Sequence, residues 1–233
     1  VPATEELRTS LSMLENNARQ AGVGVDATKK AFEDLYVVSG ETDSSVEAVS
    51  NLLQSGFTES NLQKAVEGLA NAATTFPDTI KIESLADSLQ ETIATGSATG
   101  QFAELLDRMG IGAENFSESL ALCTDQTQRQ QLALSVLVDG PLHGAYEGWK
   151  QNNESLIENR ESSLRFQEAM ADLAETILPT ITEIVELMSD LLGWFNNLPD
   201  GVKAATGVIL LFVAALGPIA GMIAAIATVT SVA

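Results

Sequence analysis

Apolar residues recur every three or four positions along most of the chain, which is the spacing of one face of a helix. In the first run the spacing alternates between four and three, as in a coiled-coil seam, through Leu7, Leu11, Leu14, Ala18, Ala21 and Val25. Gly22 and Gly24 predict the end of this helix, because glycine commonly follows the last helical turn. The run fits a self-associating helix and a helix in a monomeric core equally well.

Shorter runs of the same kind follow, and glycine or proline closes most of them. They predict helices around residues 31–38, 46–53, 62–76, 82–93, 102–109 and 125–138, with stops at Gly40, Gly56, Pro77, Gly96, Gly110 and Gly140. The side-chain oxygens of Thr42, Asp43, Ser44 and Thr58 are candidates for helix N-caps. The pattern repeats without repeating residues, so we expect short antiparallel helical hairpins rather than a solenoid.

Glycine almost disappears between Glu154 and Phe195, and the apolar spacing continues. This predicts one long amphipathic helix, kinked near Pro179, because proline lacks the amide hydrogen of the helical ladder. Its apolar stripe contains Phe166, Met170, Leu173, Ile177, Ile181, Ile184, Met188, Leu191 and Phe195. Together with Leu7, Leu11 and Leu14, the stripe is our candidate surface for self-association, most plausibly in three copies.

The last thirty residues, Ala204–Ala233, contain no charged side chain. A helix needs about 20 consecutive apolar residues to cross a bilayer core, so the segment is long enough. Gly217 and Pro218 divide it into two arms, which leaves open a kinked transmembrane helix, a hydrophobic hairpin or a pair of helices buried among proteins. The candidate membrane-inserting residues are Val208, Ile209, Leu210, Leu211, Phe212, Val213, Leu216, Ile219, Met222, Ile223 and Ile226. Pro179, Gly217 and Pro218 are the candidate hinges.

These patterns predict an all-α fold of short amphipathic hairpins, followed by a long amphipathic helix and a hydrophobic helical segment. We expect four parts: N-terminal helices with the heptad seam over residues 1–40, a short-helix domain over 41–150, the long helix over 151–198 and the hydrophobic segment over 199–233. Only 5% of the 233 residues are aromatic, so the core is built mainly from aliphatic side chains.

The chain carries 32 acidic and 12 basic residues, a formal net charge of −20. A field of this sign repels nucleic-acid phosphates, so we expect no tight nucleic-acid binding, although DNA could still pass alongside. Cys123 is the only cysteine, which excludes an intrachain disulfide and predicts a buried, inert thiol.

The sequence offers no catalytic constellation, and we expect neither an enzyme nor a bound cofactor or metal. His143 is the only histidine and its neighbours indicate a solvated or hydrogen-bonded loop position. The Gly110–Gly112 stretch is too short for a dinucleotide-binding fingerprint. Asp43, Asp78 and Asp200 lie in predicted turns without the spacing of a calcium-binding loop.

Two stretches resemble the tail tape measure proteins of long-tailed phages. The first, residues 46–110, contains the Phe-Pro-Asp of residues 76–78 and then SLADSLQE in the order of the family's core pattern. The second, residues 173–223, contains WFNNLP, an apolar helix and Leu-Gly-Pro, and is the more specific of the two. Together they cover about half of the chain.

This resemblance implies a helical protein present in several copies in the lumen of the tail, near the tip or baseplate of the virion. It implies contacts with the tail tube and with the baseplate hub or tail-tip proteins, a role in setting tail length, and release at genome ejection to help form a channel through the host membrane. Even a fully helical chain of 233 residues would reach only about 350 Å, so we expect a segment of a longer ruler.

Two other functions remain open at the level of sequence. A pore-forming toxin would wrap a hydrophobic hairpin in amphipathic helices and release it at a membrane. A membrane-anchored adaptor would carry basic residues beside its apolar segment, where this chain has only Lys203. Phage-tail-like bacteriocins and other injection machines fit the same pattern as a phage.

Overall fold

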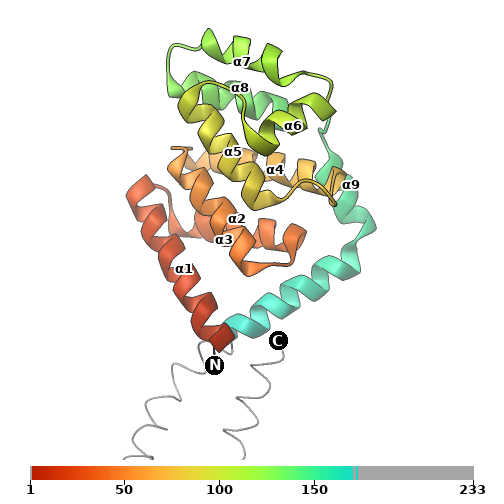
Figure 1. Ribbon diagram of the computed structural model, residues 1–233. Coiled ribbons are helices and arrows are strands. Elements are labelled where there is room, and N and C mark those ends of the chain that lie inside the picture. Colours follow the sequence, from red (N-terminus) through yellow and green to blue (C-terminus); the bar gives the residue numbers. More distant parts are fainter. Residues whose placement is uncertain (1, 170–171, 173–233) are drawn as a thin grey trace, which may run out of the picture. The chain divides into compact units, whose positions relative to one another are not determined.

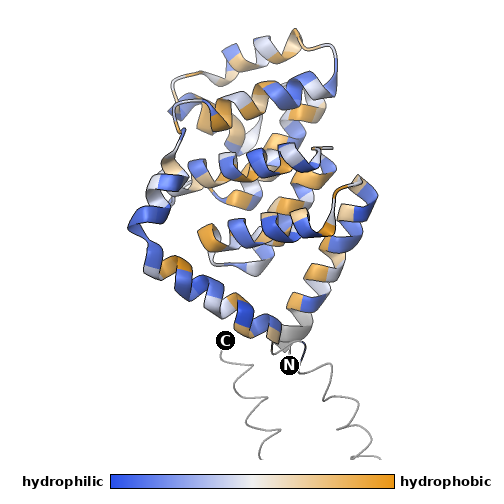
Figure 2. Ribbon diagram, turned by 180° about the vertical axis from the view of Figure 1, so that it is seen from behind, coloured by the Kyte–Doolittle hydropathy of each residue, from blue (hydrophilic) through white to orange (hydrophobic). Residues whose placement is uncertain are grey.

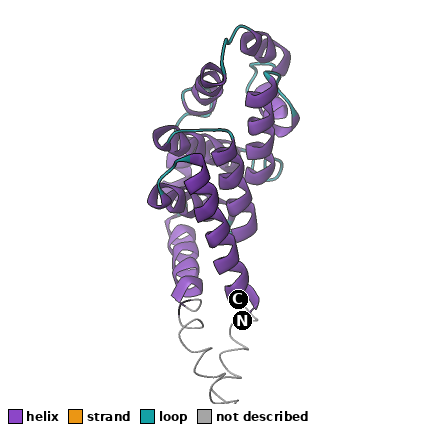
Figure 3. Cartoon of the chain, turned by 90° about the vertical axis from the view of Figure 1, so that its left-hand side faces the viewer, coloured by secondary structure: helices purple, strands orange, loops and turns teal. Residues whose placement is uncertain are grey.

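The computed structural model describes residues 2–169 and 172, and every regular element in that part of the chain is a helix (Figures 1 and 3). The predicted all-α class is therefore confirmed, and the described residues contain no strand. In chain order the helices are α1 (Pro2–Ala21), α2 (Val25–Ser39), α3 (Thr42–Gln54), α4 (Glu59–Thr75), α5 (Ile82–Thr95), α6 (Gly100–Arg108), α7 (Ala113–Ala121), α8 (Gln126–Val138) and α9 (Ala145–Asn152), followed by a helix over residues 154–169.

Glycine ends several helices where the sequence predicts it. Gly40 follows α2 with φ of 74°, and Gly96 follows α5 with φ of 76°, so both adopt the left-handed conformation that glycine reaches without strain. Each glycine donates its N–H to a carbonyl in the last turn, Gly40 to Tyr36 and Gly96 to Thr92. The predicted stops at these two positions are confirmed.

The helix starts agree less well with the sequence predictions. Thr42 is the first residue of α3 and Glu41 takes the N-cap position, so Thr42, Asp43 and Ser44 lie in the first turn and do not cap it. Thr58 does take the N-cap position of α4, but its side chain makes no capping hydrogen bond. Asp125, which the sequence predicts only as the first residue of a helix, is the N-cap of α8, and its carboxylate accepts the N–H of Gln128 at 2.9 Å.

Two short helices were not predicted. The first is α7, whose buried apolar side chains are only Phe116 and Leu120, too few to show a period in the sequence. The second is α9, which begins after Gly144 and contains Gly148, a residue that signals a loop more often than a helix. The predicted start of the long helix near Glu154 is confirmed, and its course beyond residue 169 lies outside the described residues.

Residues Thr9–Leu164 form one compact unit in which α4 is the central helix. α4 packs against α2, α3, α5, α8 and α9, while α3 packs on α5, α6 on α5 and α7 on α6 (Figure 1). The buried face of α4 includes Leu62, Val66 and Leu69. Gly68 lies where α4 meets Leu137 of α8. This unit runs across the predicted divisions at residues 40 and 150.

A second unit contains residues 1–8 and the chain from Arg165 onward. Its described residues, 2–8, 165–169 and 172, are helical. The predicted hinges and membrane-inserting residues all lie outside the described part of the chain.

Candidate functional site: apolar faces and helix ends

The heptad seam of α1 is already covered within a single chain. Leu7 and Leu14 are each 2% exposed and Ala18 is fully buried, while Leu11 is half-buried. The Asn17 side chain donates to the Ser50 hydroxyl of α3 at 3.2 Å, which ties the same helix to the unit. The self-association of Leu7, Leu11 and Leu14 stays a prediction, and it would require these side chains to serve two surfaces.

A shallow groove of about 100 Å³ runs between α1 and α2 beside the seam. Leu11 and Leu14 line one wall, Val25 and Thr28 the other, and Glu15 and Lys29 also line it. The groove is smaller than the pockets of roughly 300–1,000 Å³ that hold drug-sized ligands. It is therefore a local packing gap rather than a ligand pocket.

A few large apolar side chains remain exposed elsewhere among the described residues. Leu122 is 83% exposed, Met13 55%, Phe166 47% and Leu156 37%. Phe166 is the first residue of the predicted self-association stripe, and because its side chain is exposed it could contact another copy. The rest of that stripe lies outside the described residues: Met170, Leu173, Ile177, Ile181, Ile184, Met188, Leu191 and Phe195.

The ends of α2 and α5 are held by arginines in the same way. Arg160 donates from one Nη to the carbonyls of Val37 and Val38, at 2.6 and 2.7 Å. Arg129 of α8 donates from one Nη to the carbonyls of Ile93 and Ala94, at 3.2 and 3.1 Å. In both helices these are the carbonyls three and two residues before the terminal glycine, groups that have no partner inside the helix. A guanidinium at this place also meets the negative end of the helix dipole.

The glycines make room for the two guanidinium groups. A Cβ on Gly40 would lie 3.0 Å from Nε and Nη2 of Arg160, and a Cβ on Gly96 would lie 3.0 Å from Cζ of Arg129. Each glycine thus serves twice, once for its positive φ and once for the close approach of an arginine. At the end of α3, amide side chains replace the arginine, because Gln126 and Gln130 donate to the Ser55 carbonyl at 3.0 and 2.6 Å.

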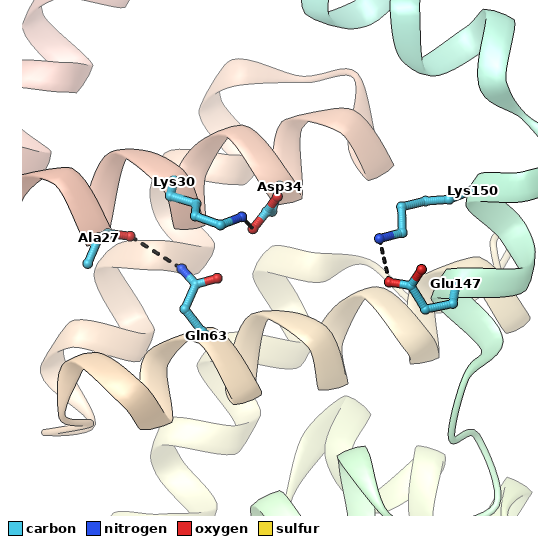
Figure 4. Close-up of polar contacts among 6 residues, drawn as sticks. All are labelled: Ala27, Lys30, Asp34, Gln63, Glu147 and Lys150. Atoms are coloured by element: carbon cyan, nitrogen blue, oxygen red, sulfur yellow. Dashed lines mark hydrogen bonds and ion pairs between the residues drawn. The ribbon is translucent and has the colours of Figure 1, made fainter.

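A buried amide joins α4 to α8 and α9. The Asn71 side chain is fully buried, accepts the N–H of Tyr146 at 2.9 Å and donates to the Leu137 carbonyl at 3.5 Å. Nearer the start of α4, the side chain of Gln63 donates to the Ala27 carbonyl of α2 at 3.4 Å (Figure 4). These polar links fix the register of the helices around α4.

Acidic side chains surround the one strongly perturbed phenol. Burial raises the pKa of Tyr146 well above its ordinary value of about 10, and the negative charges of Asp34, Glu147 and Glu161 raise it further. Lys30 pairs with Asp34 at 2.7 Å, and Lys150 pairs with Glu147 (Figure 4). The Lys150 ammonium also lies 4.6 Å from the centre of the Tyr146 ring. The raised pKa keeps the phenol of Tyr146 protonated to a higher pH than an exposed tyrosine.

Within residues 2–169, the structure does not gather the chemistry-bearing side chains into one place. His143 is exposed and its Nδ1 lies 2.8 Å from the Val138 carbonyl, which confirms a hydrogen-bonded turn histidine. Cys123 is only half-buried, so the predicted buried thiol is wrong; it follows the exposed Leu122 at the end of α7, where little packs over it. The described residues hold no group of three or more side chains that could ligate a metal ion.

A hollow larger than the groove between α1 and α2 lies where helix ends meet. It has a volume of about 340 Å³ and is lined by Val38, Ser39, Glu41, Ala73, Lys81 and Glu83, among others. Negatively charged carboxylates and a positively charged ammonium group line the hollow together with aliphatic side chains. Nothing in this lining selects one class of ligand.

The candidate membrane-inserting residues Val208–Val213, Leu216, Ile219, Met222, Ile223 and Ile226, with the hinges Pro179, Gly217 and Pro218, are outside the described residues. Within the described part of the chain, no helix combines the length and apolar character needed to span a bilayer. No protein-family model, curated protein or solved structure matches this chain.

Proposed function

We propose that the chain is a segment of a phage tail tape measure protein, lying in several copies inside the tail near its tip. The observation that carries this proposal is the thirty-residue uncharged run Ala204–Ala233, which follows WFNNLP in a chain of net charge −20. An acidic surface avoids gripping DNA that must pass it, and an apolar run needs lipid or protein to cover it. Both are properties that a lumenal, membrane-active tail component requires.

The helical architecture supports the proposal. The stretch that resembles the family's core, residues 46–110, lies in α3 to α6, whose successive helices pack on one another through the α3–α4, α4–α5 and α5–α6 pairs. The resemblance implies helices here, and four helices joined by short loops make up the stretch.

The compact fold of residues Thr9–Leu164 favours a place at the tip of the tail over a place along the part of the tail whose length is measured. As one straight helix, the 156 residues of Thr9–Leu164 (164 − 9 + 1) would span about 230 Å. Folded into a compact unit, they contribute far less to length. We therefore assign the length-setting role to the remainder of a longer ruler, and assign this unit to the distal end of the tail.

The proposed membrane step is tested by the substitution Phe212→Asp. An Asp at the centre of a membrane helix costs about 3 kcal/mol, roughly a hundredfold in the insertion equilibrium. Leu122→Asp is the matched control, because Leu122 is 83% exposed on the compact unit and should tolerate the charge. We expect normal tails from both variants, and a loss of discharge into liposomes only for Phe212→Asp. Parental discharge by Phe212→Asp would refute the membrane step.

The rival function, a pore-forming toxin, predicts a different result. A toxin would be a monomer that permeabilises liposomes by itself, without a tail. A tail component should form a homo-oligomer, for which we expect three copies, and should act only as part of the particle. Mass measurement of the full chain together with a dye-release assay separates the two.

A further inference from the structure

Arg160 lies in a helical segment of the unit whose side chains are mostly exposed. We define the strap as residues 154–164, the helical segment that follows α9 and ends at the boundary of the compact unit. Most of its side chains are exposed, and only Ile157, Arg160 and Leu164 are half-buried or buried (Figure 2 shows the mainly hydrophilic colouring of this helix). These three residues are spaced three and four apart, so one narrow stripe faces the unit.

The strap has a separate start. Asn153 ends α9 with φ of −129° and ψ of 28°, outside the helical region. Its side chain donates to the Trp149 carbonyl at 2.8 Å, and its own carbonyl accepts the N–H groups of Leu156 and Ile157. Asn153 therefore ends α9 and precedes the first turn of the strap, so a change in its backbone angles would turn the strap relative to α9.

Arg160 is at the middle of the buried stripe, and its partners are 122 and 123 residues away in the chain. Both of its acceptors are carbonyls at the end of α2, so they stay in place whether or not the strap is docked. Opening would break the two charge-assisted hydrogen bonds of Arg160 and uncover the narrow stripe of Ile157 and Leu164. Segments with few buried apolar contacts open at a lower free energy than the core.

We propose that the strap is a latch, which opens about Asn153 without unfolding of the bundle and is held closed by the guanidinium of Arg160 on the end of α2. This inference goes beyond the proposed tail function and does not depend on it, because it concerns only the opening of residues 154–164.

Hydrogen exchange followed by mass spectrometry on the full-length chain tests the latch. In the parent, strap amides should exchange faster than those of α4. Arg160→Met keeps most of the side-chain length and removes the donors, so strap exchange should accelerate by about tenfold to a hundredfold, the effect of losing charge-assisted hydrogen bonds. Arg160→Lys should fall between the two, while α3, α4 and α5 stay at parental rates.

Arg129→Met is the matched control, because it removes the same kind of contact from the end of α5. It should leave strap exchange at the parental rate. A second pair uses the glycines: Gly40→Ala places a Cβ against Arg160 and should release the strap, whereas Gly110→Ala, at φ of 75° with nothing within 4 Å, imposes similar backbone strain without that contact.

Three results would overturn the latch. The first is a parental strap as protected as α4, a measurement that needs no variant to fold. The second is unchanged strap exchange in Arg160→Met. The third is equal acceleration of strap and bundle in that variant, since the strap would then open only with the whole unit.

Discussion

A single methyl group at Gly68 should separate two helices that now touch. Gly68 lies inside α4, and a Cβ built there would be 2.6 Å from the Cβ of Leu137 on α8, closer than carbon atoms approach without a shift. Leu137 is fully buried, so its Cβ has no free space to move into. Gly68→Ala must therefore push the α4 and α8 backbones apart.

The magnitude follows from two opposing effects. Alanine inside a helix gains about 0.5–1 kcal/mol over glycine, because the unfolded chain loses freedom. Forcing a methyl group into a packed contact costs about 1–3 kcal/mol. We expect Gly68→Ala to be roughly 1 kcal/mol less stable than the parent.

Gly148→Ala is the matched control on α9, since a Cβ there meets nothing within 4 Å. It should gain about 0.5–1 kcal/mol. The helix-propensity gain is common to both variants, so their difference, about 1–3 kcal/mol, isolates the contact with Leu137. Thermal unfolding monitored by circular dichroism would show midpoints about 2–12 °C apart, using about 2–4 °C per kcal/mol for a chain of this size. If Gly68→Ala proved as stable as Gly148→Ala, α4 and α8 would not be in the described contact.

Three further predictions follow from other parts of the unit. Asn71→Leu leaves the Tyr146 N–H and the Leu137 carbonyl without their partner, so it should lower the free energy of unfolding by about 2–4 kcal/mol. The control is Asn115→Leu, at an exposed position, which should change that free energy by less than about 0.5 kcal/mol. Urea titration measures both values. Because the pKa of Tyr146 is raised in the folded state, the folded chain holds that proton above pH 10 while the unfolded chain loses it; stability should fall above pH 10, and less steeply in Tyr146→Phe. Analytical ultracentrifugation of the full chain in mild detergent should show a trimer, and a monomer at high concentration would count against self-association.

The ends of the short helices could be predicted from sequence because their causes are local. Gly40 and Gly96 stop helices through their own backbone freedom, which needs no distant partner. The two missed helices lacked such a signal: α7 buries only Phe116 and Leu120, and α9 carries a glycine in its middle. Their packing on α6 and α4 supplies what local propensity does not.

The arginine contacts could not be predicted from sequence at all. Arg160 meets carbonyls more than 120 residues away, and a backbone carbonyl carries no side-chain identity that could be matched in advance. The same holds for Asn71, which resembles any other polar residue of a helix until its burial between α8 and α9 is known. The sequence likewise did not predict which surface covers the apolar face of α1, because a heptad spacing fits a partner in the same chain or in another copy.

The tail proposal is tested most directly by locating the chain in the particle that contains it. An epitope tag inserted after Gly110 keeps the glycine itself and lies in an exposed turn, so it should not disturb the packing of the unit. Electron microscopy of tagged particles before and after discharge would then give the position of the compact unit. We predict label inside the distal end of intact tails and its loss from tails that have ejected their DNA. Label found only on free chains outside any tail, with tails assembled normally in their absence, would contradict the proposal.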